Sequence, residues 1–401
     1  MIGPKGTGHD RQRLVVVLGM HRSGTSAITR GLKVLGVDLG DGLQGAESGV
    51  NDKGFWEDIE IHDLDVDMLE ALGRDWGHVS AIGKDQLRAL HEQDYFPRAV
   101  ALLRRKADHV PVFGFKDPRL AMLLPFWQEV FEYLELDVAY VIAIRNPLSV
   151  ARSLKKRDRM EAEQAYLLWL GHVVTPLAGT LGSRRVLVDF DCLMRSPDSV
   201  LKRMGEGLDL AVDEAELDCY RNDFLDPRSR HTVFDLDDLH SDAACPSLVA
   251  EVYGALHGLA DGSRLDDMAR GDDVARWFSE FSRLEPALRL VDKLLIKHRA
   301  TERVIGARDE ALVRLQAHID DDIHRSVSWR VTAPLRLAGQ SFKYLHGLFG
   351  RGSAGACGSV EADSPGAVPA LGEPGNSTSV PLPATDGSEI ASTESIRNLP
   401  A

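Results

Sequence analysis

The stretch Arg13–Gly36, RLVVVLGMHRSGTSAITRGLKVLG, has the residue types and spacing of a loop that binds phosphate. Gly19 and Gly24 stand where a Walker-type loop, G-x-x-x-x-G-K-[ST], has its two glycines, and Ser26 stands at its hydroxyl position. An apolar strand precedes this loop and a helix beginning at about Thr25 follows it. Backbone N–H groups at such a strand-to-helix turn face one point, where they can bind an oxyanion.

Thr25 occupies the position at which a Walker-type loop has its lysine. That lysine normally contacts the terminal phosphates of a nucleoside triphosphate. Arg22 offers a different cation, whose planar fork suits bidentate binding of an oxyanion. We therefore expect the loop to hold a phosphate-like group rather than a triphosphate with its magnesium. The alternative is an ordinary strand–turn–helix corner, which the agreement of strand, glycines, arginine and hydroxyls disfavours.

Within this loop the stretch MHRSGTSAI resembles the phosphate loop of the sulfotransferase family. In that family the loop binds the 5′-phosphosulfate of 3′-phosphoadenosine-5′-phosphosulfate. The resemblance implies that this donor contacts the residues of the motif, which are Arg22, Ser23, Gly24, Thr25 and Ser26.

A second phosphate site is implied by the same resemblance, because the family binds the donor's 3′-phosphate with an arginine at a strand end and a serine eight residues later. The stretch VAYVIAIRNPLSVARSL supplies Arg145 and Ser153 at that spacing. Pro147 suits the first turn of a helix that would carry Ser153. The alternative is a solvated arginine and a serine on a helix surface.

Lys116 is expected to be the second cation at the reacting centre, because it follows an apolar strand in VPVFGFKDPRL. In the family a lysine at this place contacts the bridging region of the donor. A surface lysine at a strand end is the alternative. The cytosolic branch of the family has a catalytic histidine two residues later, where this chain has Pro118, so that branch is a poor template.

Glu57 is the expected general base, in a segment where other branches of the family use a glutamate. A carboxylate beside Phe55 and Trp56 would be partly desolvated and would accept a proton more readily. A helix-capping or surface acid is the alternative, and Asp117 and His62 are the next candidates for the base.

Elements that could position these residues alternate along the chain. Four apolar runs read as strands, at 14–18, 111–115, 138–144 and 186–190, and they are continuous rather than alternating, as in strands covered on both faces. Helical patterns lie between them, at 121–134, 147–156, 162–177 and 198–204. This order predicts an α/β fold, a doubly wound parallel sheet with a P-loop-like phosphate-binding loop, followed by a helical C-terminal region and a disordered tail.

Changes in composition suggest four parts of the chain. We expect a flexible N-terminus at 1–12 and a sulfotransferase domain at 13–265. A helical amphipathic region with coiled-coil character should follow at 274–350. The segment 351–401 is rich in Gly, Ser, Pro, Ala and Thr, so we expect a disordered tail there. Pro286 is expected to break or bend the helical region near its start. The stretch SVSWRVTAPLR, at 326–336, resembles a tail found after bacterial glycan-synthesis glycosyltransferases. The basic amphipathic region at 325–350 could contact an anionic membrane or a partner helix.

The charge balance limits the partners of the chain. Its formal net charge is −14, which argues against general nucleic-acid binding but not against a locally basic pocket. The four cysteines have no Cys-x-x-Cys spacing, so we expect buried thiols rather than a zinc or redox site. The polar N-terminus lacks a signal-peptide core, so we expect a cytoplasmic protein, and a peripheral position at the inner membrane face stays open.

Together these features favour a sulfotransferase that moves a sulfuryl group from 3′-phosphoadenosine-5′-phosphosulfate to a hydroxyl acceptor, a carbohydrate or glycolipid. The mechanism requires no metal. One alternative is a P-loop kinase or nucleotide hydrolase in which Asp189, at a strand end, holds magnesium. The other is a non-catalytic scaffold that acts through the helical region. Whether the chain forms a homo-oligomer stays open.

Overall fold

A computed structural model describes residues 11–47, 51, 53–226, 234–265, 271–336 and 338. The chain divides into two compact units, Met1–Leu312 and Val313–Ala401. The first unit contains every described strand and every candidate site residue named above. Among the described residues, no helix is both long enough and apolar enough to cross a membrane.

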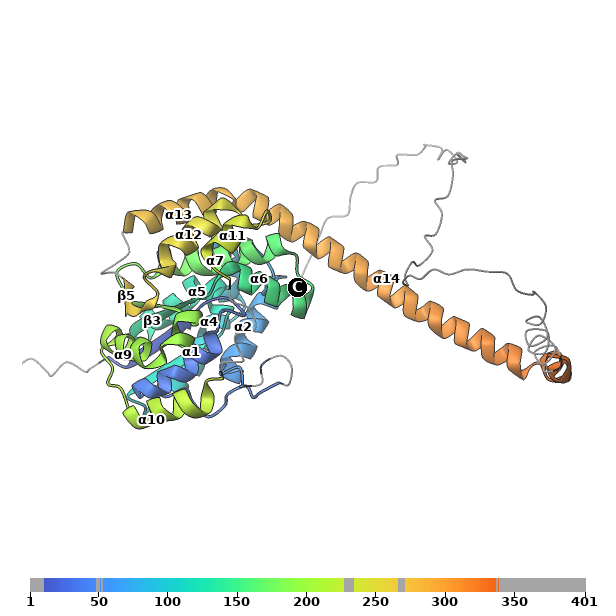
Figure 1. Ribbon diagram of the computed structural model, residues 1–401, viewed down its shortest axis with the longest axis horizontal. Coiled ribbons are helices and arrows are strands. Elements are labelled where there is room, and N and C mark those ends of the chain that lie inside the picture. The colour runs from blue at the N-terminus through green and yellow to red at the C-terminus, as the bar shows by residue number, and fades with distance from the viewer. Residues whose placement is uncertain are drawn as a thin grey trace, which may run out of the picture. The chain divides into compact units, whose positions relative to one another are not determined.

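A five-stranded sheet forms the centre of the first unit, in the order β2-β1-β3-β4-β5 (Figure 1). The strands are β1 (Arg13–Leu18), β2 (Val112–Lys116), β3 (Asp137–Ile144), β4 (Arg184–Asp189) and β5 (Asp261–Arg264). The first four are parallel, and β5 pairs with β4 in the antiparallel direction. After β1 the chain adds β2 at one edge of β1, and it then crosses to add β3 at the opposite edge. The sheet therefore has its topological switch point between β1 and β3. Ligands of open α/β sheets bind at the carboxyl ends of the strands at this point.

Both faces of the sheet are covered by helices (Figure 1). Alternate residues of β1 explain this arrangement, because successive side chains of a strand point to opposite faces. Leu14, Val16 and Leu18 pack in a core with residues of α2, α4 and α5, whereas Val15 and Val17 pack with residues of α1, η1 and α9. A third core joins α6, α7, α12 and α13. These helices are α1 (Thr25–Gly31), η1 (Leu32–Leu35), α2 (Ile59–Ala71), α4 (Tyr95–Ala107), α5 (Leu120–Tyr133), α6 (Pro147–Asp158), α7 (Ala162–Gly179), α9 (Pro197–Leu208), α12 (Ser247–His257) and α13 (Gly271–Arg283).

The other described helices include the longest, α14. They are α3 (Lys84–Glu92), α8 (Phe190–Arg195), α10 (Glu214–Cys219), the π-helix η2 (Tyr220–Phe224), α11 (Leu236–Ser241), α14 (Glu285–Arg325) and α15 (Val327–Val331). Leu288 of α14 is buried in the third core. Asp292, one turn further along, accepts hydrogen bonds from the backbone N–H groups of Val79 and Ser80, at 2.8 and 3.1 Å. The start of α14 is therefore part of the first unit.

The predicted α/β class and the four predicted strands are confirmed, with shifted ends. Phe190, predicted as strand, begins α8, because the Asp189 carboxylate accepts hydrogen bonds from the N–H groups of Asp191 and Cys192 and so caps that helix. The helical C-terminal region is confirmed where it is described, and α14 restarts at Glu285 with Pro286 in its first turn. The predicted tail at 351–401 and residues 1–10 of the predicted N-terminus lie outside the described residues.

The expectation of buried thiols is wrong in its detail. Cys192, Cys219 and Cys245 are free, but each is half-buried rather than buried. The fourth cysteine, Cys357, lies outside the described residues.

Candidate active site

A cavity of about 390 Å³ brings the two predicted phosphate-binding stretches together. It lies at the carboxyl ends of β1 and β3, where the switch point of the sheet favours a ligand. Residues of the loop after β1, of the segment before α2, of β2 and of α6 form its walls. The lining consists of His21, Arg22, Gly24, Thr25, Ser26, Ala27, Asn51, Lys53, Phe55, Glu57, Lys116, Pro118, Arg145, Arg152, Ser153, Lys156, Arg157, Phe190, Met194, Phe224, Leu225 and Asp226.

The loop after β1 takes a conformation that its sequence explains. Gly24 has φ 78°, a backbone region in which a side chain is strained, and it precedes the first turn of α1. A Cβ atom at this position would lie 2.1 Å from a ring carbon of Phe190, so only glycine allows α8 to pack against the loop. Ser23 and Thr25 are buried in this turn, while Ser26 is only half-buried and lines the cavity.

Arg22 joins the two predicted phosphate-binding stretches directly. Its Nε donates a hydrogen bond to Ser153 Oγ at 2.8 Å, and its carbonyl oxygen accepts one from Arg145 Nη1 at 3.2 Å. Burial, and then the neighbouring charges of Arg157 and Arg145, lower the pKa of Arg22. The serine and the two arginines predicted from separate motifs therefore lie at one place, where an anion would relieve the repulsion between cations.

Arg145 is only 7% exposed, although it carries a charge. Its guanidinium lies over the ring of Phe190, 4.8 Å from the ring centre, and its Nε is 3.9 Å from a carboxylate oxygen of Asp191. Asn146 caps α6 by accepting a hydrogen bond from Leu148 N–H, which sets the direction in which the helix leaves β3. The helix then presents Ser153 to the cavity.

Lys116 and Glu57 form a buried ion pair in the same cavity. Lys116 Nζ lies 2.6 Å from Glu57 Oε1, and the two side chains are 1% and 6% exposed. Lys116 Nζ also donates a hydrogen bond to Ser26 Oγ, at 3.4 Å. The lysine is the last residue of β2 rather than the first after it, and it lies between the candidate base and the phosphate-binding loop.

Glu57 is held in place by its neighbours in the segment before α2. The carboxylate of Asp58 caps α2 by accepting hydrogen bonds from two backbone N–H groups, and it also pairs with Lys106 Nζ at 2.8 Å. Asn51 donates a hydrogen bond to Ser26 Oγ at 3.2 Å, which links this segment to the loop. No motif in the sequence identifies Asn51 as a residue of the site, because its contact with Ser26 depends on how the chain folds back over α1.

Trp56 does not lie in the cavity beside the Glu57 carboxylate, where the sequence placed it. Its ring lies 5.5 Å from the guanidinium of Arg30 and packs edge-on against Phe224, whereas Phe55 lines the cavity. Trp56 is therefore not among the residues that line the cavity with Glu57.

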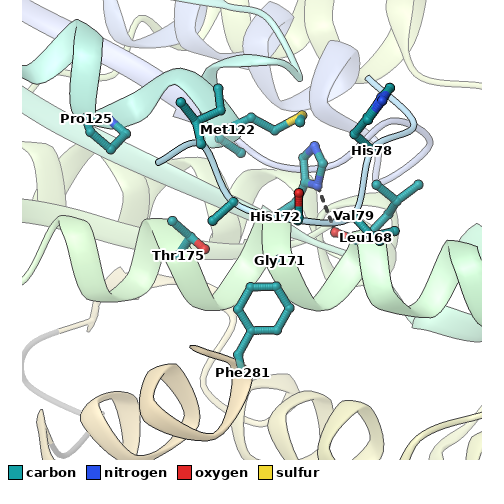
Figure 2. Close-up of a pocket in the computed structure, with 13 residues that line it drawn as sticks. His78, Val79, Met122, Pro125, Leu168, Gly171, His172, Thr175 and Phe281 are labelled. Carbon is teal, nitrogen blue, oxygen red and sulfur yellow. Dashed lines mark hydrogen bonds between the residues drawn. The ribbon is translucent and has the colours of Figure 1, made fainter. Parts of the chain in front are cut away.

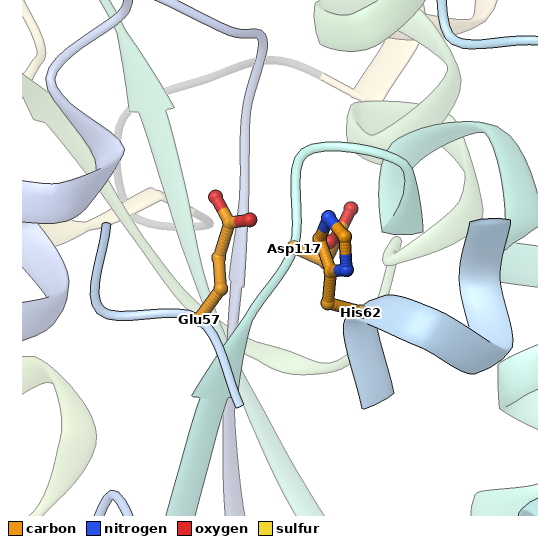
Figure 3. A group of neighbouring side chains, drawn as sticks. All are labelled: Glu57, His62 and Asp117. Carbon is orange, nitrogen blue, oxygen red and sulfur yellow. The ribbon is translucent and has the colours of Figure 1, made fainter. Parts of the chain in front are cut away.

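The two other candidates for the base lie close to Glu57, as Figure 3 shows. Ligand atoms of Glu57, His62 and Asp117 all lie within 4.8 Å of one another. Asp117 is fully buried and accepts two hydrogen bonds from Arg119 Nη1, at 3.1 and 3.0 Å. Burial raises the pKa of Asp117, and the nearby Glu57 raises it further. Because a cation already pairs with each carboxylate, the group offers a metal ion little net negative charge.

Asp189, the magnesium ligand of the kinase alternative, has another role. It is fully buried and caps α8, and its second oxygen lies 3.4 Å from Tyr253 Oη and from His257 Nδ1. It is not among the residues that line the cavity. Asp189 therefore has a structural role away from the cavity and is not placed to hold magnesium on a nucleotide bound there, as the kinase alternative requires.

Several cavity residues were not predicted from the sequence. Lys53, Arg152, Lys156 and Arg157 line the cavity in addition to the three predicted cations. The run Lys155–Arg157 is visible in the sequence as a basic helix end, but the sequence does not tell which of its side chains face the cavity.

A smaller cavity of about 50 Å³ lies between α5, α7 and the segment 78–82 (Figure 2). Its walls are largely apolar, and His172 in its wall donates a hydrogen bond from Nδ1 to the carbonyl oxygen of Leu168 at 2.8 Å. Burial lowers the pKa of His172 to about 4. A cavity of this size can hold a few water molecules but not a nucleotide.

Comparison with known proteins adds little to this geometry. A scan against models of protein families and a search of curated protein sequences both find no match. Among solved structures, the chain is similar to the sulfotransferase domain from the Synechococcus PCC 7002 olefin synthase, with 18% sequence identity and a TM-score of 0.34. The similarity covers 63% of this chain and 98% of that domain. Values this low do not establish a common family.

Proposed function

We propose that the chain is a sulfotransferase that moves a sulfuryl group from 3′-phosphoadenosine-5′-phosphosulfate to a hydroxyl group, on a carbohydrate or a glycolipid. The observation that carries the proposal is the single cavity lined by both Arg22 and the Arg145/Ser153 pair. A donor of this kind has an anionic group at each end of its ribose, so it needs two sites for oxyanions within the reach of one molecule. The domain responsible would be residues 13–265.

The residues of the cavity divide between the two ends of this donor. Arg22 and the loop around Gly24 would hold the 5′-phosphosulfate, and Arg145 and Ser153 would hold the 3′-phosphate. Arginine suits both places because its guanidinium forms two parallel hydrogen bonds to an oxyanion. No γ-phosphate has to be bound, which accounts for Thr25 at the position of the usual lysine.

Glu57 and Lys116 would carry the chemistry. Glu57 accepts the proton of the acceptor hydroxyl, and the freed oxygen forms a bond to sulfur. The bond from sulfur to the bridging oxygen breaks, and its electron pair remains on the 5′-phosphate of the product, adenosine 3′,5′-bisphosphate. Lys116 neutralises the charge that grows on this phosphate. Its position between Glu57 and Ser26 supports this role.

Binding of the product nucleotide tests the proposal. We expect adenosine 3′,5′-bisphosphate to raise the melting temperature of the full chain more than ATP with magnesium does, because a ligand stabilises the state that it binds. Arg22→Ala and Arg145→Ala should each weaken its binding by at least about tenfold. Arg88→Ala is a suitable control, because Arg88 is 69% exposed and pairs with the exposed Asp85.

Two outcomes would contradict the proposal. A larger stabilisation by ATP with magnesium favours a kinase or a nucleotide hydrolase, and no stabilisation by either nucleotide favours a scaffold. A direct test follows, in which the transfer of radiolabelled sulfate from the donor to a mixture of oligosaccharides is measured with the wild-type chain and with Glu57→Gln.

A further inference from the structure

The candidate active site holds more lysine and arginine side chains than the three assigned to the donor. Among its described lining residues, Lys and Arg occupy seven positions and acidic residues two. The seven are Arg22, Lys53, Lys116, Arg145, Arg152, Lys156 and Arg157, and the two are Glu57 and Asp226. This occurs in a chain with a formal net charge of −14, so the cluster is local and not a consequence of composition.

Three of the additional cations belong to one face of α6. Arg152 immediately precedes Ser153 in the sequence. One helical turn after Ser153, about 5 Å along the axis, come Lys156 and Arg157. Arg152 and Lys156 are exposed and form no ion pair within the described part of the chain. Like charges in one cavity repel one another, and an anion bound among them relieves this repulsion.

Arg157 is oriented by two contacts. Its Nε donates hydrogen bonds to both carboxylate oxygens of Asp158, at 3.0 and 2.8 Å, and its guanidinium lies 5.4 Å from the ring centre of Trp76. The ring of Trp76 in turn lies 4.6 Å from that of His21, which immediately precedes Arg22 in the loop. Arg157 therefore lies beside the part of the loop that would hold the reacting end of the donor.

The positive charges of Lys116 and Arg157 both act on His21. Burial lowers the pKa of His21 well below its ordinary value, and the positive charges of Arg119, Arg157 and Lys116 contribute to this shift. Lys116 is the cation of the reacting centre. Arg157, through Trp76 and His21, therefore lies beside the loop where an acceptor must approach, and Arg152 and Lys156 line the same cavity.

We propose that the acceptor itself carries a negative charge close to its reacting hydroxyl, a carboxylate or a sulfate ester on a carbohydrate, and that Lys156 and Arg157, with Arg152, bind it. This inference rests on the proposed function, since it assigns Arg22, Lys116 and Arg145 to the donor. Lys53 is not included, because its Nζ contacts the backbone carbonyl of Asp223 on another wall.

The test compares sugars of matched length that differ in charge. Short oligogalacturonates supply carboxylates, short sulfated dextrans supply sulfate esters, and maltooligosaccharides are neutral. Binding of each to the full chain is measured by calorimetry in the presence of saturating adenosine 3′,5′-bisphosphate. We expect at least one charged probe to bind about tenfold or more tightly than the neutral one. The tighter of the two charged probes identifies the anionic group.

A pair of double variants on α6 assigns the effect to the cavity. Lys156→Gln/Arg157→Gln should weaken binding of the charged probe by about tenfold or more, and should lower the slope of its salt dependence. Lys155→Gln/Arg159→Gln removes the same charge from exposed positions of the same region that do not line the cavity, and it should have no effect. The affinity for adenosine 3′,5′-bisphosphate should be unchanged in Lys155→Gln/Arg159→Gln, and in Lys156→Gln/Arg157→Gln it should fall by much less than the affinity for the charged probe.

Three results would overturn the inference. Equal binding of neutral and charged probes, or of none of them, removes the evidence for an anionic acceptor. Equal effects of the two double variants show that only the net charge matters. A loss of nucleotide affinity in Lys156→Gln/Arg157→Gln as large as that for the charged probe assigns these cations to the donor. Failure of the wild-type chain to bind the nucleotide contradicts the proposed function instead, and that result is visible before any sugar is added.

Discussion

Removing either partner of the Glu57–Lys116 pair should destabilise the protein, and removing both should restore most of the loss. The two side chains lie 2.6 Å apart and are 6% and 1% exposed. Lys116→Met leaves a carboxylate buried without its cation, and Glu57→Met leaves a buried ammonium. Breaking a buried pair in this way costs about 3–5 kcal/mol, whereas replacing both partners by apolar residues of similar volume is often neutral.

Urea unfolding of the full chain, followed by tryptophan fluorescence, measures these differences. We expect each single variant to lose about 3–5 kcal/mol of unfolding free energy and the double variant to lie within about 2 kcal/mol of the wild type. Asp85 and Arg88, which are 93% and 69% exposed, form a control pair whose removal should change stability by less than about 1 kcal/mol.

A double variant as unstable as the sum of the two single variants would refute this reasoning. It would show that Glu57 and Lys116 contribute independently, and that the pair is not the neutralising contact that its geometry indicates. Activity should be lost in all three variants, so the recovery of stability in the double variant would separate folding from chemistry at the same two positions.

Three further predictions follow from single contacts. Gly24→Ala should weaken nucleotide binding by at least about tenfold in a calorimetric titration, because φ is 78° and a Cβ would lie 2.1 Å from the Phe190 ring. Asp292→Asn should lower the unfolding free energy in urea by about 1–3 kcal/mol, because its carboxylate accepts two hydrogen bonds from backbone N–H groups, and an unchanged midpoint would contradict this. The pKa of His172 is depressed to about 4, so its neutral form stabilises the fold and this contribution is lost as the pH falls from about 6.5 to 4. Over that range the wild type should lose roughly 3 kcal/mol more than His172→Gln, as measured by urea unfolding at each pH.

The sequence was sufficient for the parallel part of the sheet, because strands covered on both faces are continuous apolar runs. β5 was missed because Asp261–Arg264 is short and polar, and it is held as a strand only by pairing with β4. α2 and α4 were not assigned either. The acidic stretch of Ile59–Ala71 hides the apolar positions of α2, which pack against alternate residues of β1.

The candidate site was predictable where a residue is marked by its place in a motif. Arg22, Arg145 and Ser153 were identified in this way, and the structure places them together in one cavity. Their roles in binding a donor stay predictions. Asn51, Arg152 and Lys156 could not be found, because facing the cavity depends on how α6 and the segment before α2 pack around the loop.

The position of Lys116 explains why a costly buried ion pair would persist at this site. Its ammonium is shared between Glu57 and Ser26 of the phosphate-binding loop, so an anion bound at the loop competes with Glu57 for the same charge. Without such an anion the pair neutralises itself, and Glu57 Oε1 is held by the Lys116 ammonium. An anionic donor that attracts Lys116 would weaken this contact and leave Glu57 more available to the acceptor. One lysine can therefore stabilise the empty site and also couple activation of the base to the presence of the donor. Two apolar residues at positions 57 and 116 could give the protein equal stability, but they could not provide this coupling.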